Sequence, residues 1–362
     1  MASDWTEMKR IHVLTTDDTP NSLAFNFPLQ FNKRMLKAFG LDVRLFFKIT
    51  KPVFECDVLF VNSKCFRLTG QEKQQEFLAD AKERVDVVLW FDTTDSTGTT
   101  QFEVMPYVEG YYKSQALRDR RWYLKEYYRN RIFIDYYHTH FGLHDDGPYD
   151  RFQPALEKDL AKIHVSWSSA LGDYGVRAKY YDKARKYLPL PYRYSAQFVP
   201  PEKDRAVDIT CRVGLTHRSS IVRHHREMIV TILAQTYGVS SEKIARKKFF
   251  EELQNAKIAI SPFGWGEITL RDFEIIINGA ALFKPDLSHM ETWPPLFVEH
   301  ETYVPHRWDM SDFVEKLDHL LSSSEYTEIA QNAQQVYHQY LFERKGHEEF
   351  CKRVSQIVEQ YV

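Results

Sequence analysis

Short apolar runs alternate with longer amphipathic stretches from the start of the sequence, and this alternation leaves few folds open. In the first half the apolar runs fall at 11–14, 41–47, 56–63 and 85–91, and the helical patterns at 23–39 and 71–84. Strands separated by a crossover helix pair in parallel, and the crossover is right-handed. The run at 85–91 is apolar on both faces, as a central parallel strand is. The first half therefore predicts an α/β fold built on a parallel sheet.

The same rhythm resumes after a proline-rich segment at 187–205, which holds four prolines and no clear period. Strands are expected at 206–214, 257–260 and 281–285, and helices at 219–238, 268–279, 308–323 and from 325 onward. Polar, proline-rich segments of this kind separate domains. We therefore expect two Rossmann-like domains facing across a cleft, at 1–195 and 205–340, and a C-terminal helix at 341–362 that packs back on the first domain. In open parallel sheets the ligand binds beyond the carboxyl ends of the strands.

The composition excludes several classes of protein. The 362 residues are 43% hydrophobic and 27% charged, which fits about two globular domains and excludes a disordered or collagenous chain. A net charge of −2 provides no field that would attract nucleic acid. The cysteines form no C-x-x-C pair, and we expect them to be reduced and the protein to be cytoplasmic. They are Cys56, Cys65, Cys211 and Cys351. The N-terminus carries charges where a signal peptide needs an apolar run, and no apolar run is long enough for a membrane span.

Several motifs of catalytic and nucleotide-binding proteins do not occur. The sequence has no P-loop G-x-x-x-x-G-K-[ST], no dinucleotide-binding G-x-G-x-x-G, no G-x-S-x-G elbow and no H-E-x-x-H zinc helix. It also has no D-x-D pair, with which single-domain sugar transferases hold a metal and a diphosphate. A phosphate-binding site in this chain would have to be formed by residues outside these motifs.

The most distinctive stretch runs from Ser261 to Pro295. Gly264 and Gly266 flank Trp265 just before a predicted helix, where glycines let the backbone approach a phosphate and the helix start offers free N–H groups. On that helix the spacing of 4 and 3 residues places three charged side chains on one face. They are Glu267, Arg271 and Glu274. The arginine could neutralise a diphosphate and Glu274 could accept hydrogen bonds from a ribose. The alternative is a solvated ladder of charges.

This stretch resembles the C-terminal half of the two-domain, GT-B type glycosyltransferases, as in their group 1 and exostosin-like members. The shared order is a glycine-containing loop, an acidic and basic helix, and G-A-x-L at the next strand, and the resemblance covers about 208–321. It implies a nucleoside-diphosphate sugar donor held by the C-terminal domain, an acceptor entering from the N-terminal domain, and no essential metal or other cofactor. Retaining members place seven residues between two glutamates, whereas six separate Glu267 from Glu274.

Two further segments of the second half are candidates for binding the donor. In the first, Gly214 ends a strand and is followed by His217, Arg218 and Arg223, which could contact a departing diphosphate. Residues 223–226 could instead form a solvated basic face, the interpretation we favour for the histidines within it. In the second, the polar loop at 284–295 contributes Lys284 and His289.

Acidic loops after two strands of the first half are candidates for the catalytic base. An inverting transferase needs a carboxylate or histidine to take the proton of the acceptor hydroxyl. Asp17 and Asp18 follow the first strand, and Asp92 and Asp95 follow the buried strand at 85–91. Turn and capping chemistry explains such aspartates equally well.

Two other features have several interpretations. His138 and His140 would share one face of a strand, and a metal site there would need Asp135 as a third ligand, so structural hydrogen bonds or acceptor contacts are favoured. The basic, aromatic run at 118–137 could stack single-stranded nucleic acid, line an acceptor groove, or bring the protein to a lipid-linked acceptor at a membrane face. The net charge disfavours nucleic acid.

Together these patterns predict a metal-independent glycosyltransferase that moves a sugar from a nucleoside-diphosphate sugar to a glycan or glycoconjugate acceptor in surface polysaccharide synthesis. The alternatives are a sugar-nucleotide epimerase of the same architecture and a non-catalytic protein that binds carbohydrate or nucleotide.

Overall fold

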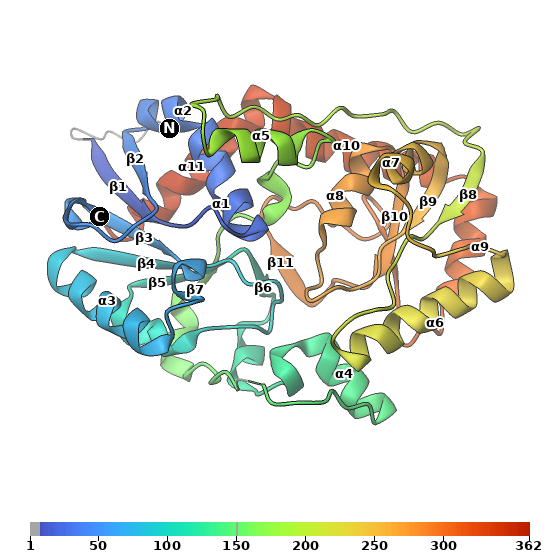
Figure 1. Ribbon diagram of the computed structural model, residues 1–362, viewed down its shortest axis with the longest axis horizontal. Coiled ribbons are helices and arrows are strands. Elements are labelled where there is room, and N and C mark those ends of the chain that lie inside the picture. The colour runs from blue at the N-terminus through green and yellow to red at the C-terminus, as the bar shows by residue number, and fades with distance from the viewer. Residues whose placement is uncertain (1–7, 150) are drawn as a thin grey trace.

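Two parallel β-sheets form the framework of the chain in the computed structural model, which describes residues 8–149 and 151–362 (Figure 1). In this part of the chain the first sheet has six strands in the order β2-β1-β3-β4-β5-β7. They are β1 (Lys9–Leu14), β2 (Leu41–Phe46), β3 (Val58–Asn62), β4 (Val87–Asp92), β5 (Gly110–Lys113) and β7 (Ile163–Val165). The second sheet has the order β12-β10-β9-β8. Its strands are β8 (Val207–Thr210), β9 (Ala256–Ile260), β10 (Ala281–Pro285) and β12 (Val304–His306).

Helices cover both sheets, as parallel strands require. The α-helices are α1 (Pro20–Phe31), α2 (Lys33–Ala38), α3 (Gln71–Arg84), α4 (Ile132–Phe141), α5 (Ala178–Arg185), α6 (Ser220–Tyr237), α7 (Arg246–Asn255), α8 (Leu270–Ile277), α9 (Phe313–Ser323), α10 (Tyr326–Phe342) and α11 (Arg344–Glu359). Short 3₁₀ turns lie at 51–54, 63–66, 102–107, 120–124, 128–130, 157–162 and 169–171. Within the described residues, no helix is both long and apolar enough to cross a membrane.

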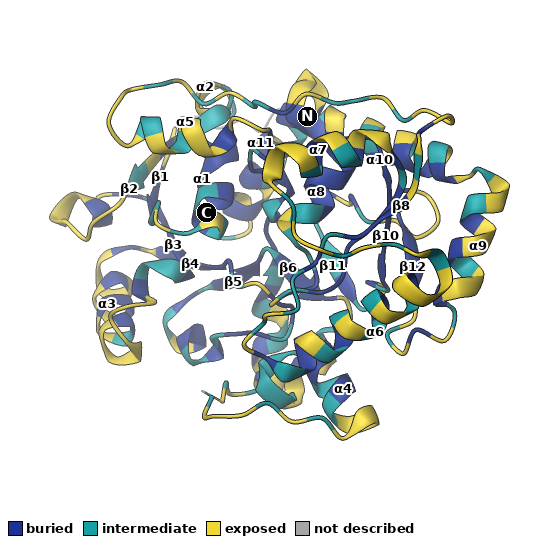
Figure 2. Cartoon of the chain, turned by 45° about the vertical axis from the view of Figure 1, so that its right-hand side comes forward, coloured by how far each residue is buried: buried dark blue, intermediate teal, exposed yellow. Residues whose placement is uncertain are grey.

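The expected central strand is β4. All six of its residues are buried, and its side chains enter hydrophobic clusters on both faces of the sheet. Figure 2 shows the strands of both sheets buried beneath helices whose outer faces are exposed. The prediction of an α/β fold with two Rossmann-like halves is confirmed, because every described pairing within these two sheets is parallel.

A pair of strands and the C-terminal helix are among the contacts that hold the halves together besides the proline-rich segment. An antiparallel pair of short strands, β6 (Gln115–Leu117) and β11 (Met290–Thr292), lies between the two sheets (Figure 1). The C-terminal α11 leaves the second half and packs into the hydrophobic cluster of β1, β3 and β4. The Tyr112 hydroxyl on β5 donates a 2.8 Å hydrogen bond to Gln360 just after α11. The end of the chain is thus part of the first half's core.

Some predicted elements differ from the observed ones. His138 and His140 lie on helix α4 and not on a strand, because 132–141 buries its apolar residues with a helical spacing. The Nδ1 atom of His138 donates to the carbonyl of Leu143 (2.7 Å) and that of His140 to the carbonyl of Tyr136 (3.0 Å). The predicted helix at 23–39 starts earlier, at Pro20, and is divided at Asn32.

Candidate functional site

A cavity of about 230 Å³ lies between the two halves, at the carboxyl ends of strands from both sheets. Helix α1 and the segments that follow β4, β5 and β7 line it from the first half, and residues 265–266 and 268–270, which follow β9, line it from the second. Carboxyl strand ends are where ligands bind in open parallel sheets. This cleft is therefore the candidate active site.

Asp95 is the carboxylate that lines the cleft. It is exposed, and its Oδ1 atom accepts a 2.6 Å hydrogen bond from Asn21 Nδ2, at the start of α1. The Asn21 amide also donates to the carbonyl of Thr93 (2.7 Å). Asp95 is thus held in place while the carboxylate stays accessible to a substrate.

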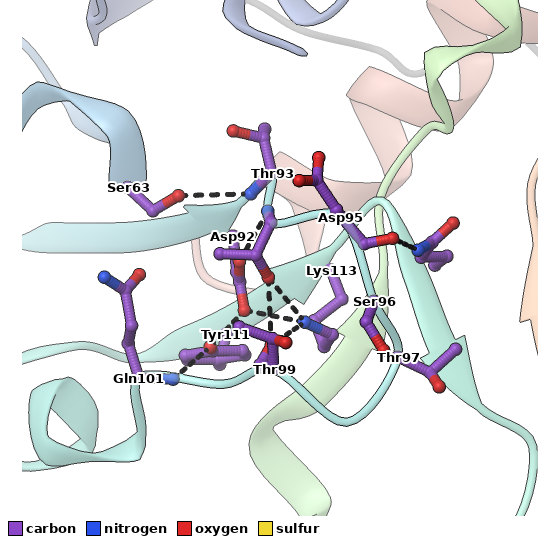
Figure 3. A network of polar contacts seen from close by, with 12 residues as sticks. Ser63, Asp92, Thr93, Asp95, Ser96, Thr97, Thr99, Gln101, Tyr111 and Lys113 are labelled. Atoms are coloured by element: carbon purple, nitrogen blue, oxygen red, sulfur yellow. Dashed lines mark hydrogen bonds and ion pairs between the residues drawn. The ribbon is translucent and has the colours of Figure 1, made fainter. Parts of the chain in front are cut away.

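Asp92 is fully buried inside the first half (Figure 3). It accepts a 2.7 Å bond from Lys113 Nζ and a 2.5 Å bond from the Tyr111 hydroxyl. Burial works to raise its pKa, but the Lys113 charge and the hydrogen bonds from Lys113, Thr94 and Tyr111 together outweigh burial, and the pKa of Asp92 is lowered. The Asp92 carboxylate therefore stays ionised in a buried ion pair with Lys113, and it does not line the cleft.

Asp17 is partly exposed and Asp18 is exposed, and neither lines the cleft. The Asp17 carboxylate is 3.5 Å from Lys186 Nζ. Asp18 forms a 2.8 Å ion pair with Arg67, and this bond lowers its pKa. Of the four aspartates predicted as bases, only Asp95 reaches the cleft.

Glu267 is fully buried between the two halves, away from solvent. Its carboxylate accepts hydrogen bonds from the Thr97 hydroxyl (2.6 Å), the Thr97 amide (3.2 Å) and the Ser96 hydroxyl (3.1 Å). Burial works to raise the pKa of Glu267, but His289 and Thr97 outweigh it and lower the pKa. Glu267, which the sequence predicted to bind the donor, therefore connects the loop that contains Asp95 to the second half.

Lys284 is also buried, on β10, with its charge neutralised internally. Its Nζ atom lies 2.6 Å from Asp272 and donates to the carbonyl of Glu267 (2.8 Å). Asp272 also closes the capping box of α8 with Thr269, which fixes the start of that helix. Lys284 is therefore buried behind the start of α8 and does not line the cleft.

Three of the predicted donor-binding residues, Gly214, Gly264 and Arg271, lie near Arg226. Arg226 donates to the carbonyls of Gly214 (2.9 Å) and Phe263 (3.2 Å), and a Cβ on Gly264 would lie 3.8 Å from Arg226 Nη2. Burial and the neighbouring Arg271 charge lower the pKa of Arg226 to about 10. Glu274 lies within electrostatic reach of Arg271 and forms a 2.9 Å ion pair with Arg246.

The interpretation of 223–226 as a solvated basic face is wrong for two of its residues. Arg226 is only partly exposed, and His225 is fully buried, where its ring bonds the Tyr137 hydroxyl (2.7 Å) and accepts from the Phe263 amide (3.1 Å). Arg218 and Arg223 are exposed. The helical spacing of 225 and 229 with the apolar side of α6 was the signal that could have placed His225 inside.

Trp265 lines the cleft within a small cluster of rings and charge. The His217 ring lies 4.6 Å from Trp265, and the Arg131 guanidinium lies 4.6 Å above the indole ring. Arg131 also donates to the Trp265 carbonyl (2.7 Å). Arg131 comes from the first half, so sequence spacing gave no indication of this contact.

The N-terminus of α6, which follows the predicted donor residues His217 and Arg218, is engaged by the chain itself. Asp145 Oδ1 accepts hydrogen bonds from the Ser220 hydroxyl (2.8 Å) and the Ile221 amide (3.1 Å). The Asp145 carboxylate thus lies at the N-terminus of α6, where an anion would otherwise bind.

Among residues 8–149 and 151–362, no three His, Cys, Asp or Glu side chains cluster as metal ligands would.

No protein-family model matches the chain, and no curated protein matches it in sequence. Among solved structures it is similar to an α-glucosyltransferase in complex with UDP and a 13-mer DNA (TM-score 0.43, 10% identity, 98% of this chain and 100% of that one). HepE from Anabaena, in complex with UDP-glucose, gives a TM-score of 0.43 at 9% identity over 97% of this chain and 100% of that one. A protein from Listeria monocytogenes named as a UDP-N-acetylglucosamine 2-epimerase gives 0.43 at 10% identity over 98% and 97%. What each of these binds is a property of that protein.

Proposed function

We propose that this chain is a glycosyltransferase that moves a sugar from a nucleoside-diphosphate sugar to a glycan or glycoconjugate acceptor, without a metal cofactor, in polysaccharide synthesis. One observation carries the proposal: the loop 264–266 has the Arg226 side chain beside Gly264 and the Asp95 loop packed on Gly266. A cationic group and a candidate base thus meet at the same turn.

The arginines suit a diphosphate. Arg226 is partly desolvated and lies near the like charge of Arg271, and both effects lower the pKa of Arg226. A bound diphosphate would relieve this repulsion and, as the leaving group, would be stabilised by both guanidinium groups. Glu274, on the same helix as Arg271, is the residue we assign to the ribose hydroxyls.

Asp95 would serve as the base. The acceptor hydroxyl oxygen bonds to the anomeric carbon, the bond between that carbon and the diphosphate oxygen breaks, and the hydroxyl proton passes to the Asp95 carboxylate. The diphosphate leaves with the electron pair of the broken bond, next to Arg226 and Arg271.

Thermal unfolding with UDP, GDP and their sugars, each with and without EDTA, tests the proposal. A nucleotide at 100 times its Kd stabilises the fold by about 2.7 kcal/mol. We expect a shift with at least one nucleotide that survives EDTA and is lost in Arg271→Ala, whereas the α11 surface variant Arg344→Ala keeps it. No shift with any nucleotide would overturn the proposal, and a shift abolished by EDTA would overturn its metal-independent part. Turnover of the donor without an acceptor would assign an epimerase instead.

A further inference from the structure

A second, larger cavity of about 1000 Å³ lies at the carboxyl ends of β10 and β12, apart from the residues that line the cleft. The 3₁₀ turn at 120–124, helix α4, the loop after β10 and the segment 305–316 enclose it. Its size is at the upper end of the range for small-molecule sites. Neither the donor-binding arginines nor Asp95 line it.

Aromatic side chains form one corner of this cavity. The Trp308 ring stands edge-on to Tyr136 (5.2 Å, 87°) and to His289 (5.2 Å, 89°), and its Nε1 atom donates to the Asp286 carbonyl (2.9 Å). Trp122, which is 39% exposed, also lines the cavity. Rings held in fixed orientations can pack against the apolar C–H face of a sugar.

The lining is strongly acidic. It contains six carboxylates and two permanently cationic side chains, Arg307 and Lys316, and Lys316 is already paired with Asp312 (2.9 Å). The carboxylates are Asp135, Asp286, Glu299, Asp309, Asp312 and Glu315. Such a surface repels phosphates and sugar acids, whereas carboxylates accept hydrogen bonds from hydroxyl groups.

His289 provides an independent indication of a ligand. Its side chain is 6% exposed, and within the described structure neither ring nitrogen has a hydrogen-bond partner. The nearest carboxylate oxygen, on Glu267, is 3.7 Å from Nε2, beyond hydrogen-bonding distance. Glu267 is thus an electrostatic neighbour of His289, but neither buried ring nitrogen makes a hydrogen bond in the described part of the chain, and a polar ligand in the cavity that His289 lines could supply one.

We propose that this cavity binds a glycan that carries no acidic group, with Trp122, Tyr136 and Trp308 as its aromatic wall and the carboxylates as acceptors of its hydroxyl groups. The inference rests on the proposed function in one respect: it takes this glycan to be a part of the acceptor that lies outside the cleft, away from the hydroxyl group that reacts next to Asp95.

An array of neutral, amine-bearing and acidic oligosaccharides tests which class of glycan binds. Calorimetry of protein variants with the best-bound neutral oligosaccharide tests whether it binds in this cavity. We expect binding of neutral or amine-bearing glycans and about tenfold weaker binding in Trp122→Ala. Leu124→Ala, in the same turn, removes a side chain of similar exposure (37%) that does not line the cavity, and is expected to bind as the wild type does. Asp309→Asn, which keeps the shape of an exposed lining residue, is expected to weaken binding about threefold.

Three results would overturn the inference: no binding to neutral or amine-bearing glycans, a preference for acidic ones, or equal effects of Trp122→Ala and Leu124→Ala. Thermal shifts with UDP and GDP on the same preparations separate the two proposals. Glycan binding without a nucleotide shift would contradict the proposed transferase and support the glycan site. A nucleotide shift without glycan binding would support the transferase and contradict the glycan site.

Discussion

The Thr97 hydroxyl donates a 2.6 Å hydrogen bond to Glu267 Oε1, and this bond joins the two halves of the chain at the edge of the cleft. Thr97 follows β4 in the first sheet and Glu267 follows β9 in the second. Both side chains are fully buried, so the bond is made out of contact with water. It holds the loop that presents Asp95, two residues before Thr97.

Replacing Glu267 by glutamine should weaken this junction. Glutamine offers an NH₂ group where the carboxylate accepts from Ser96 and Thr97, so a buried donor is left without a partner. We expect a loss of about 1–3 kcal/mol in the free energy of unfolding, measured by urea denaturation at pH 7. Glu328→Gln, on the exposed side of α10, is the control and should be neutral.

The same carboxylate predicts how the junction responds to acid. The pKa of Glu267 is lowered in the folded chain, so its contribution to stability is present above the unfolded pKa of about 4.3 and is lost as pH falls through the folded pKa. The difference in stability between wild type and Glu267→Gln should therefore shrink below about pH 4. A difference that grows on acidification would contradict the assignment.

Asp95 and Asp92 should respond to amidation in opposite ways. Asp95→Asn removes the proposed base from an exposed site, and we expect kcat to fall about 10²- to 10⁴-fold with little change in unfolding. Asp92→Asn leaves the Lys113 charge buried without its counter-ion, and we expect a loss of stability of about 3–5 kcal/mol. Transfer assays and urea denaturation of both variants decide the matter. Full activity in Asp95→Asn would remove it from the mechanism.

The two glycines of the loop 264–266 should differ in their tolerance of a methyl group. A Cβ on Gly266 would overlap the carbonyl oxygen of Asp95, whereas a Cβ on Gly264 would lie 3.4 Å from Thr269 Cγ2, an ordinary contact. Gly266→Ala should therefore cost about 1–3 kcal/mol and displace the Asp95 loop, and Gly264→Ala should be close to neutral. Thermal unfolding of the two variants measures the difference. Equal stability would mean that the halves do not approach this closely.

Buried histidines should make the chain lose stability in mildly acidic solution. Burial lowers the pKa of His306 to about 4, and it lowers the pKa of His225 well below its usual value. The unfolded chain, with a histidine pKa of about 6.5, then binds more protons than the folded one between pH 6.5 and 4. The free energy of unfolding should fall by up to about 1.4 kcal/mol per pH unit for each histidine over this range.

The variant His306→Phe isolates one of these contributions. The His306 ring is stacked on Phe283 (5.2 Å) and meets Phe313 edge-on (4.9 Å), so a phenyl ring suits the position. Urea denaturation between pH 4 and 7 should give a shallower pH dependence for this variant. A slope equal to that of the wild type would mean that His306 titrates normally in the folded chain.

Local pattern was sufficient for most of the framework. The strands, the order of helices between them and the parallel pairing follow from apolar periodicity and crossover geometry, which act over a few residues. The sequence also placed Gly214 and Gly264 after strands of the second half, and both lie beside Arg226. It misjudged α4, because a short run dense in aromatic residues is compatible with a strand or a helix until its packing partner is known.

The amino-acid sequence by itself determined that this chain folds as two parallel α/β halves with polar residues at their strand ends. Only the tertiary structure decided which of those residues face the cleft. Asp92 and Asp95 stand three positions apart in the sequence, yet one closes an ion pair with Lys113 and the other lines the cleft. Arg131, Asp145 and Glu267 act across the boundary between the halves. Periodicity reports burial within an element, whereas contacts between distant segments depend on how the elements pack, and no short-range pattern encodes that.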